Sequence, residues 1–536
     1  MQAISPTLQL WSWTFLILYV GAMLYLGYVA QRRVTNADQF ATARGSYGPL
    51  FLAFAFAATT ASGATFIGIP GIGYHYGLSV IWVAFLYPIG VFLGMGLCMR
   101  AIARGGAQLG SRSIPEYLGQ RYRSEALRIV VSVFSLLLFF YIAGQLVSCL
   151  VMFASMLGAE PFWALVITCG VLFLYVAAGG AHADILTDGV QGMLMLALGV
   201  AVLILFLTGY SVTGGLEGLL ARLSAQDPLL LSWMRPDNSL TNSVWALSCL
   251  ILATIPMGLM PHLGNKLWAI REQGALKQFL RAGFVIAMLI PAVGLGGVLA
   301  RAILGDDLLA SGFGSNMAIP ALFLHLFPDW VAALLGMGVL AAVMSTADGL
   351  IISSSQVLAN DLYRCSFAPR FHGAKTESEI DRLTLQISRF GTFLALLVSA
   401  ILAWLFKDMN VLLLVWIGLG GMMAALAGPL ILGSLWRGMT PAAAMTSFVV
   451  GGGWFIALHS GLLGQSDDAI RSGNAVAALW QWVINQQANP YACATLGGLM
   501  GMLTALLVSA NTKKLPEEHL NLVFSSSERP TQRTTA

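Results

Sequence analysis

Residues 338–364 read GVLAAVMSTADGLIISSSQVLANDLYR, and this stretch decides the fold class. It begins as an apolar segment and then carries Ser345, Thr346 and Asp348, where a membrane helix would be expected to continue with hydrocarbon side chains. Polar groups at that depth are costly, so a helix that keeps them faces a bundle interior or a water-filled cavity. The stretch therefore predicts a membrane helix that lines a site.

The polar residues of this stretch fall on one helix face. Ala342, Ser345, Thr346 and Gly349 are spaced i, i+3, i+4 and i+7, which places them in one stripe. Small residues allow close backbone approach, and hydroxyl oxygens suit a hard cation. The alternative is that the hydroxyls bond back to carbonyls of their own helix and only aid packing. Asp348 lies off this face and receives no role from the pattern.

Composition makes the chain an integral membrane protein. Of its 536 residues 57% are hydrophobic and only 10% are charged, whereas a soluble domain has about 25% charged residues. We predict an all-α polytopic protein with about 13 transmembrane helices of about 20 residues each. The predicted spans lie near 8–29, 47–69, 77–99, 129–156, 161–178, 187–209, 241–262, 279–303, 328–358, 387–406, 411–435, 440–461 and 490–509.

The charge distribution predicts the orientation. With the N-terminus outside and the C-terminus in the cytoplasm, all but five of the 28 Lys and Arg residues fall on the inner side, Lys266 among them. This bias follows the positive-inside rule and agrees with an odd number of spans. The net charge of +4 is therefore a signal of topology and not of nucleic-acid binding.

Two predicted spans are interrupted. The span at 47–69 has small and hydroxyl residues in its middle and Pro70 near its end, and the span at 241–262 contains Pro256, Gly258 and Pro261. Proline and glycine unwind or kink helices, and unwound backbone at membrane depth persists only beside protein or a water-filled cavity. Broken helices in corresponding positions of two halves are typical of the binding site of an inverted-repeat transporter.

A third polar segment, AAGGAHADILTDGVQGML at residues 177–194, links two spans. Gly179 and Gly180 permit a tight turn, and Asp184, Thr187 and Asp188 open the next span. These side chains either cap the new helix or, for the deeper Asp188, pair with a cation.

The motifs ATTASGATFIGIPG, GGAHADILTDGVQG, MPHLGNK and AAVMSTADGLIISSSQVLANDLY occur in the order typical of the sodium:solute symporter family, which this chain resembles over about residues 10–510. The resemblance implies the leucine-transporter-like fold of two inverted five-helix repeats. We then expect a first helix and loop (1–46), the first repeat (47–209), an extracellular loop (210–240), the second repeat (241–435), two further spans (436–509) and a disordered cytoplasmic tail (510–536).

The resemblance also implies a sodium site made only of oxygen ligands. The expected ligands are the carbonyls of Ala58, Ala61 and Ala342 and the hydroxyls of Ser345 and Thr346. Such a set without a carboxylate suits a monovalent ion better than calcium. Asp188 matches a family acid that is linked to sodium affinity or to a second ion.

The solute is expected to bind beside the sodium ion. The candidate residues come from the broken spans and the fourth span: Thr59, Thr60, Ser62, Tyr141, Gln145, Met257 and Pro261. Met257 is equally compatible with ordinary packing. Lys266 stands where pantothenate and monocarboxylate carriers of the family have an arginine, and we interpret it as a cytoplasmic positive-inside residue in preference to a carboxylate partner.

The sequence thus predicts a sodium-coupled symporter in the bacterial inner membrane, multi-pass, that imports a small organic solute by alternating access. The best-fitting solute is a monocarboxylate or pantothenate-like compound. The alternatives are a sodium- or proton-coupled, proline-like amino-acid symporter and a transporter-like solute sensor. An enzyme is disfavoured because the sequence offers no nucleophile–base pair and no metal-ligand cluster. Nucleic acid is not an expected partner, and the oligomeric state stays open.

Overall fold

The long apolar runs form helices because a helix satisfies its own backbone hydrogen bonds in hydrocarbon. A computed structural model describes residues 4–310, 314–409, 411–464 and 475–524, and within them all regular elements are helices. The α-helices are α1 (Pro6–Gln31), α2 (Ala37–Thr42), α3 (Pro49–Thr60), α4 (Ile69–Tyr76), α5 (Val80–Leu109), α6 (Ile114–Arg121), α7 (Glu125–Ser135), α8 (Leu138–Leu157), α9 (Pro161–Thr208), α10 (Gly215–Gln226), α11 (Val244–Leu252), α12 (Pro261–Gly264), α13 (Leu276–Leu289), α14 (Gly294–Leu304), α15 (Ala318–Leu326), α16 (Asp329–Gln356), α17 (Ala368–Phe371), α18 (Glu377–Leu405), α19 (Val411–Leu426), α20 (Gly433–Leu435), α21 (Pro441–His459), α22 (Ala475–Ile484), α23 (Pro490–Asn511) and α24 (Glu517–Phe524).

Short 3₁₀ and π segments interrupt or extend these helices. The 3₁₀ segments are η2 (Gly77–Ser79), η3 (Pro228–Leu231), η4 (Met257–Leu259), η5 (Asn265–Ala269), η6 (Gln273–Ala275), η7 (Ile290–Val293), η8 (Asp307–Ala310) and η9 (Gly314–Met317). The π segments are η1 (Ala64–Gly68), η10 (Val357–Phe367) and η11 (Ala427–Leu432). Such irregular turns are frequent where helices kink or line functional sites.

The number of membrane-crossing helices is close to the predicted one. Among the described residues, 10 helices are long and apolar enough to cross a membrane, or up to 11 if a bent pair counts as one span. The predicted spans near 47–69 and 161–178 contain the shorter apolar helices Pro49–Thr60 and Pro161–Ala177. These helices are shorter than the predicted spans because the first ends at Thr60 and the second is kinked at Gly180. The all-α, multi-pass class is confirmed.

Both predicted helix breaks are present. Helix α3 ends at Thr60, and Ala61 has non-helical backbone angles (φ −89°, ψ 83°) before the chain resumes in η1 and α4. In the second case α11 ends at Leu252, and the segment Val244–Leu259 meets Pro261–Ala269 at a bend of 53°. Proline cannot donate a backbone hydrogen bond, which explains why this helix stops near Pro256 and Pro261.

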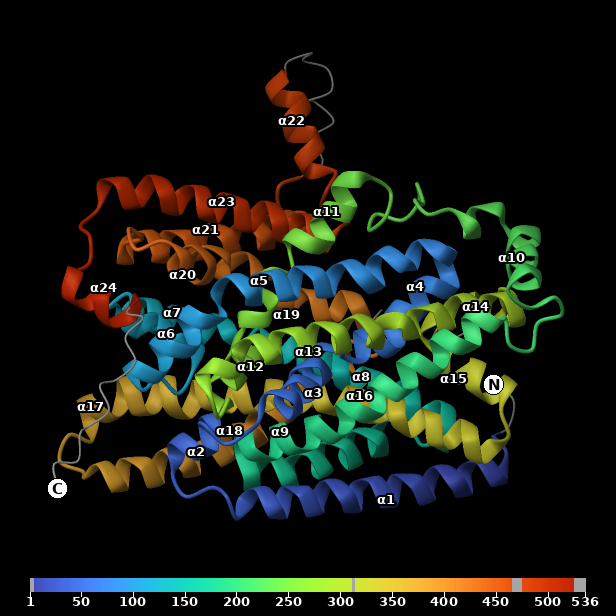
Figure 1. Ribbon diagram of the computed structural model, residues 1–536, viewed down its shortest axis with the longest axis horizontal. Helices are drawn as coiled ribbons and strands as arrows, with labels where there is room; N and C mark the ends of the chain where they lie inside the picture. Colours follow the sequence, from blue (N-terminus) through green and yellow to red (C-terminus); the bar gives the residue numbers. More distant parts are fainter. Residues whose placement is uncertain (1–3, 311–313, 410, 465–474, 525–536) are drawn as a thin grey trace.

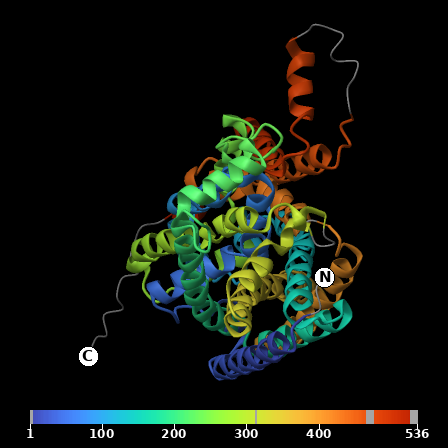
Figure 2. The ribbon, with the colours of Figure 1, turned by 90° about the vertical axis from the view of Figure 1, so that its right-hand side faces the viewer.

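The broken helix α3 lies in the interior of the bundle. Helices α3 and α16 both pack against α9, α8 packs against α16 and α19, and α1 runs along α9 and α16. Figure 1 shows α2, α6, α7, α17 and α24 at one end of the bundle and α10 at the other. Helices α21 and α23 pack together and against α19, and α22 projects away from the bundle (Figures 1 and 2).

The prediction of a disordered tail is wrong for residues 517–524. Helix α24 forms there, and its Leu520 and Val523 are buried against α5. Apolar residues three apart share one helix face, so this short helix has a side to bury. Residues 525–536 of the predicted tail lie outside the described residues.

The predicted extracellular loop, 210–240, is structured by α10, η3 and a set of ion pairs. Arg235 Nε lies 2.8 Å from Asp237 Oδ1, and Arg235 Nη2 lies 3.0 Å from Asp227 Oδ2. The hydrogen bond from Arg235 lowers the pKa of Asp237 below its usual value. This pairing therefore persists over the physiological pH range.

The kink inside α9 provides a test of the fold. Gly180 has φ 53° and ψ −139°, and a Cβ atom there would lie 2.5 Å from the carbonyl oxygen of Phe40. We expect Gly180→Ala to cost about 1–3 kcal/mol of backbone strain plus the steric clash. The apparent Tm of the detergent-solubilised protein should therefore fall by several degrees.

Gly170→Ala is the matched control, because Gly170 lies on the same helix and a Cβ atom there would have nothing within 4 Å. Equal Tm values for the two variants would contradict the assignment of strain to the kink.

Candidate functional site

Polar groups of α3, α9 and α16 meet in the interior. The Ser345 hydroxyl on α16 donates to Asp188 Oδ1 on α9 at 2.6 Å. The Thr346 hydroxyl donates to the carbonyl oxygen of Thr59, in the last turn of α3, at 3.2 Å. All four residues are fully buried. The hydroxyls therefore leave their own helix and connect α16 to α9 and to the broken α3.

The interpretation of Lys266 as a cytoplasmic positive-inside residue is wrong, because its side chain is buried and paired inside the bundle. Lys266 lies in η5 with a side chain 3% exposed, and its Nζ is 2.9 Å from Asp184 Oδ2 and 2.5 Å from Asp188 Oδ2. Nζ also lies 2.5 Å from the Thr59 hydroxyl. The bend between α11 and α12 turns η5 back into the bundle, so a lysine near the end of a predicted span becomes the partner of two buried carboxylates.

The buried carboxylates differ in how well they are satisfied. Asp188 accepts from Ser345 on one oxygen and from Thr59 and Lys266 on the other. Asp184 contacts Lys266 through Oδ2, whereas its Oδ1 is buried without a hydrogen-bond partner. Two carboxylates and one ammonium leave a formal charge of −1. Because a buried uncompensated charge is costly, the site favours one further positive charge, which a bound cation or a proton can supply.

The other residues of the expected ligand set are Ala58, Ala61 and Ala342. All three are buried, and Ala61 ends α3 in a non-helical conformation. At the end of α3 the Thr59 carbonyl oxygen accepts from Thr346 on α16, and the Ala58 carbonyl oxygen accepts from the Ala61 N–H at 3.2 Å. Hydroxyl, carbonyl and carboxylate oxygens are the ligands that hard cations prefer. The donor set thus fits the ion expected from the sequence.

Asp348, which the sequence left without a role, fastens α16 to α9. Its Oδ1 accepts from the Tyr175 hydroxyl at 2.5 Å, and its Oδ2 accepts from the Thr187 hydroxyl at 3.3 Å. Tyr175 and Thr187 are more than 150 residues away in the sequence, so no local pattern could have paired them with Asp348.

A cavity of about 40 Å³ lies on the other side of the α3 break. We call it the central cavity. Its lining combines hydroxyls, aromatic rings and aliphatic side chains: Thr60, Ser62, Ala64, Thr65, Ile69, Tyr87, Tyr141, Thr254, Met257, Leu412, Val415, Trp416, Leu419 and Tyr491. The volume suits a few water-sized groups, so the helices must separate to admit an organic solute.

Four of the seven expected solute-binding residues line the central cavity: Thr60, Ser62, Tyr141 and Met257. The other three lie elsewhere. Thr59 contacts Asp188 and Lys266, and Pro261 lines a smaller cavity next to Lys266. Gln145 accepts from the Gly63 backbone N–H at 2.7 Å, so it satisfies the unwound backbone of the break.

Sequence reasoning missed the aromatic wall of the central cavity. Tyr491 comes from α23, beyond the two predicted repeats, and its ring centroid lies 3.9 Å from that of Trp416 on α19. Tyr87 of α5 and Thr254, just after α11, complete this wall, and the Thr254 hydroxyl lies 3.2 Å from the Tyr87 carbonyl oxygen. No motif marks these residues, because they meet only after α5, α11, α19 and α23 pack together.

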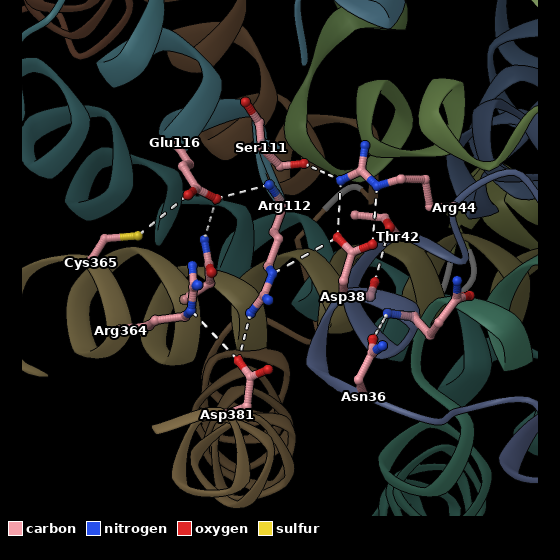
Figure 3. A network of polar contacts seen from close by, with 12 residues as sticks. Asn36, Asp38, Thr42, Arg44, Ser111, Arg112, Glu116, Arg364, Cys365 and Asp381 are labelled. Atoms are coloured by element: carbon pink, nitrogen blue, oxygen red, sulfur yellow. Dashed lines mark hydrogen bonds and ion pairs between the residues drawn. The ribbon is translucent and has the colours of Figure 1, made fainter. Parts of the chain in front are cut away.

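A polar network closes the end of the bundle near α2 and α6 (Figure 3). Arg112 Nη1 lies 3.0 Å from Asp381 Oδ1 of α18, and Arg112 Nε lies 3.8 Å from Asp38 Oδ1 of α2. Arg44 pairs with Asp38 at 2.9 Å and donates to the Ser111 carbonyl oxygen. Arg112 thereby joins α2 to α18.

Three comparisons place the chain among known proteins. The profile of the sodium:solute symporter family matches residues 40–451. The chain is 26% identical to a sodium/pantothenate symporter of Haemophilus influenzae, over 83% of this chain and 88% of that protein. It is 28% identical to a high-affinity proline transporter of Bacillus subtilis, over 80% and 88%. A substrate-bound, outward-open Na⁺-coupled sialic acid symporter has a similar structure, with TM-score 0.73, 18% identity and coverage of 94% and 98%.

The network around Arg112 supplies a test of opening at this end. Partly exposed ion pairs contribute about 0–1 kcal/mol each, and about 1 kcal/mol changes a population about fivefold. We expect Arg112→Gln to increase the open fraction and to speed maleimide labelling of Cys365, which lies in the network next to Glu116. The measurement uses a variant that retains only this cysteine.

Arg104→Gln, an exposed arginine on α5, is the control and should leave the labelling rate unchanged. Equal rates for Arg112→Gln and the parent protein would show that Arg112 does not hold this end closed.

Proposed function

The chain belongs to the sodium:solute symporter family, and we propose that it imports a small monocarboxylate or pantothenate-like solute with sodium by alternating access. Sodium is the coupling ion of this membrane-embedded symporter. The proposed ligands are the carbonyl oxygens of Ala58, Ala61 and Ala342, the hydroxyl oxygens of Ser345 and Thr346 and, at the edge of the site, the carboxylate of Asp188.

The main observation that supports this proposal is that the break at the end of α3 borders both the proposed sodium site and the central cavity. On one side, the end of α3 meets Ser345, Thr346 and Asp188 through Thr59. On the other side, Thr60, Ser62 and Thr65 line the central cavity. A cation that orders the end of α3 therefore also orders the wall of the central cavity, which couples the two binding events.

The lining of the central cavity favours a carboxylate over an amino acid. The described residues that line it include no acidic and no basic side chain. The ammonium of an amino acid would therefore lack a counter-charge. A monocarboxylate needs only one positive partner, which sodium at the break can supply. The aromatic wall then packs against the apolar part of the solute.

The energetics make the number of sodium ions important. One charge that moves through about 100 mV gains about 2.3 kcal/mol, and a tenfold sodium gradient adds about 1.4 kcal/mol. One sodium could concentrate a neutral solute roughly several hundredfold. With a monoanion the 1:1 cycle is electroneutral, so only about tenfold accumulation remains.

The proposed topology has the N-terminus outside and the C-terminus in the cytoplasm of a bacterial inner membrane. The two repeats are assigned to residues 47–209 and 241–435. The positive-inside bias supports this orientation. It makes the end with α2, α6 and α17 cytoplasmic, so the Arg112 network becomes the inner gate.

Uptake into proteoliposomes tests the function. With sodium outside only, we expect accumulation of radiolabelled monocarboxylates or pantothenate and none when choline replaces sodium at constant pH. Proline, glucose and a proton gradient alone form the other arms. Accumulation of proline without any carboxylate would establish the amino-acid alternative. Sodium-independent uptake would overturn the coupling, and binding without transport would indicate a sensor.

Thr346 tests the sodium site itself. Thr346→Val removes one hydroxyl oxygen and keeps the shape of the side chain. We expect the sodium concentration for half-maximal uptake to rise about tenfold, equivalent to about 1.4 kcal/mol of lost binding.

Thr346→Ser keeps the oxygen and should stay close to the parent protein. If Thr346→Val also kept normal sodium activation at a normal amount of folded protein, Thr346 would not be a ligand.

A further inference from the structure

Lys266 places a positive charge directly beside the proposed sodium ligands. We propose that Lys266 is a tethered cation that competes with sodium for Asp188, and that its ammonium moves toward Asp184 and the adjoining cavity when sodium binds. This inference rests on the proposed function, since it concerns the same ion site. It assigns Lys266 a role in setting the affinity for sodium and the number of ions bound.

The ammonium and the proposed sodium share the same partners. Asp188 binds Lys266 through Oδ2 and Ser345 through Oδ1. Thr59 contacts Lys266 through its hydroxyl and Thr346 through its carbonyl oxygen. A sodium ion held by Ser345 and Thr346 would therefore lie next to the lysine on one carboxylate. Two like charges at such a distance repel strongly in a buried site.

The displaced ammonium has a place to go. A cavity of about 20 Å³ adjoins Lys266, and we call it the lysine cavity; it is lined by Ala41, Thr42, Ala181, Asp184, Ile185, Pro261, His262, Asn265, Lys266, Gly349, Ile352 and Ser353. This volume admits one water-sized group, and an ammonium head is of similar size. The four-carbon stem of lysine is flexible, and Nζ already lies 2.9 Å from Asp184 Oδ2.

The lysine cavity also contains polar atoms that the present arrangement leaves without a partner. Asp184 Oδ1, Asn265 Oδ1 and Ser353 Oγ are buried without a hydrogen-bond partner, and so are both ring nitrogens of His262, one of which is an acceptor in the neutral ring. Each residue is more than nine-tenths buried. Unpaired buried polar atoms are costly. An ammonium with three donors that moves into the cavity could keep one hydrogen bond to Asp184 and donate the other two to acceptors of Asn265, Ser353 or His262.

Charge counting gives the consequence for coupling. Asp184, Asp188 and Lys266, the three charged groups in direct contact, together carry a formal charge of −1 that one sodium ion would neutralise; Asp348 lies nearby but is paired with Tyr175 and Thr187. Without the lysine the group would carry −2 and would attract a first sodium more strongly and accommodate a second. If Lys266 served only to neutralise the acids and to pack against them, its removal would disturb the sodium ligands. Sodium binding would then become weaker and not tighter.

Sodium binding to the purified full chain tests this proposal without transport. The thermal stabilisation of the detergent-solubilised protein is titrated with NaCl, with choline chloride keeping the ionic strength constant and with pH fixed. The variants are Lys266→Met, Lys266→Arg and the double variant Asp184→Asn with Lys266→Met. The double variant keeps the formal charge of the three positions at −1, whereas Lys266→Met alone leaves −2. It therefore tests the removal of the lysine even if Lys266→Met alone does not fold.

We expect Lys266→Met to lower the half-saturating sodium concentration about tenfold or more and to raise the Hill coefficient above that of the parent. Lys266→Arg keeps the positive charge and should change the half-saturating sodium concentration less than about threefold. The double variant should also bind sodium more tightly than the parent, because the competing ammonium is gone. Parent-like or weaker sodium binding in the folded lysine-free variants would overturn the proposal.

The outcome separates this inference from the proposed function. A parent protein that sodium neither stabilises nor drives in uptake counts against the proposed function itself. A normal sodium response in the parent with no gain in the lysine-free variants counts against the competition by Lys266 alone.

Discussion

The arrangement of the membrane core depends on the buried contact of Lys266 with Asp184 and Asp188. Three charges in a hydrocarbon-embedded bundle are tolerated only when they are paired and hydrogen-bonded. The pairing fixes η5 against α9 and α3, after the bend near Pro256 and Pro261 has turned η5 into the bundle. Because the pairing leaves a formal negative charge, it also creates a place that a cation fits. The constraint that stabilises the fold is thus the one that prepares the ion site.

The break in α3 connects the buried ion pairs with the central cavity. Unwound backbone needs partners at membrane depth, and Gln145 supplies one to Gly63 while Thr346 bonds to the carbonyl oxygen of Thr59. These partners come from α8 and α16, which pack against each other. A change in the position of α16 therefore alters both the ion ligands and the wall of the central cavity.

The sequence predicted what local pattern can show and failed where distant segments meet. The face of Ser345 and Thr346 and the interruptions of the spans at 47–69 and 241–262 were predicted because periodicity, proline and glycine act locally. Lys266 was misread because the positive-inside rule counts every lysine near a span end, and Asp188 is 78 residues away from it. Helix α24, in the predicted tail, was not predicted because its buried apolar face consists only of Leu520 and Val523. The wall that Tyr491 and Trp416 form depends on how four helices pack.

The separation of charges between the two sites bears on specificity. All acidic and basic groups of the described core near the break lie on the ion side, whereas the central cavity is lined by neutral residues. A neutral cavity in a low-dielectric interior rejects a charged solute unless a counter-ion arrives with it. A carboxylate would then bind well only after sodium has neutralised the excess charge of Asp184 and Asp188. With the proposed sites, electrostatics favours a binding order of the ion first and then the anionic solute, and the competition proposed for Lys266 would set how readily the first step occurs.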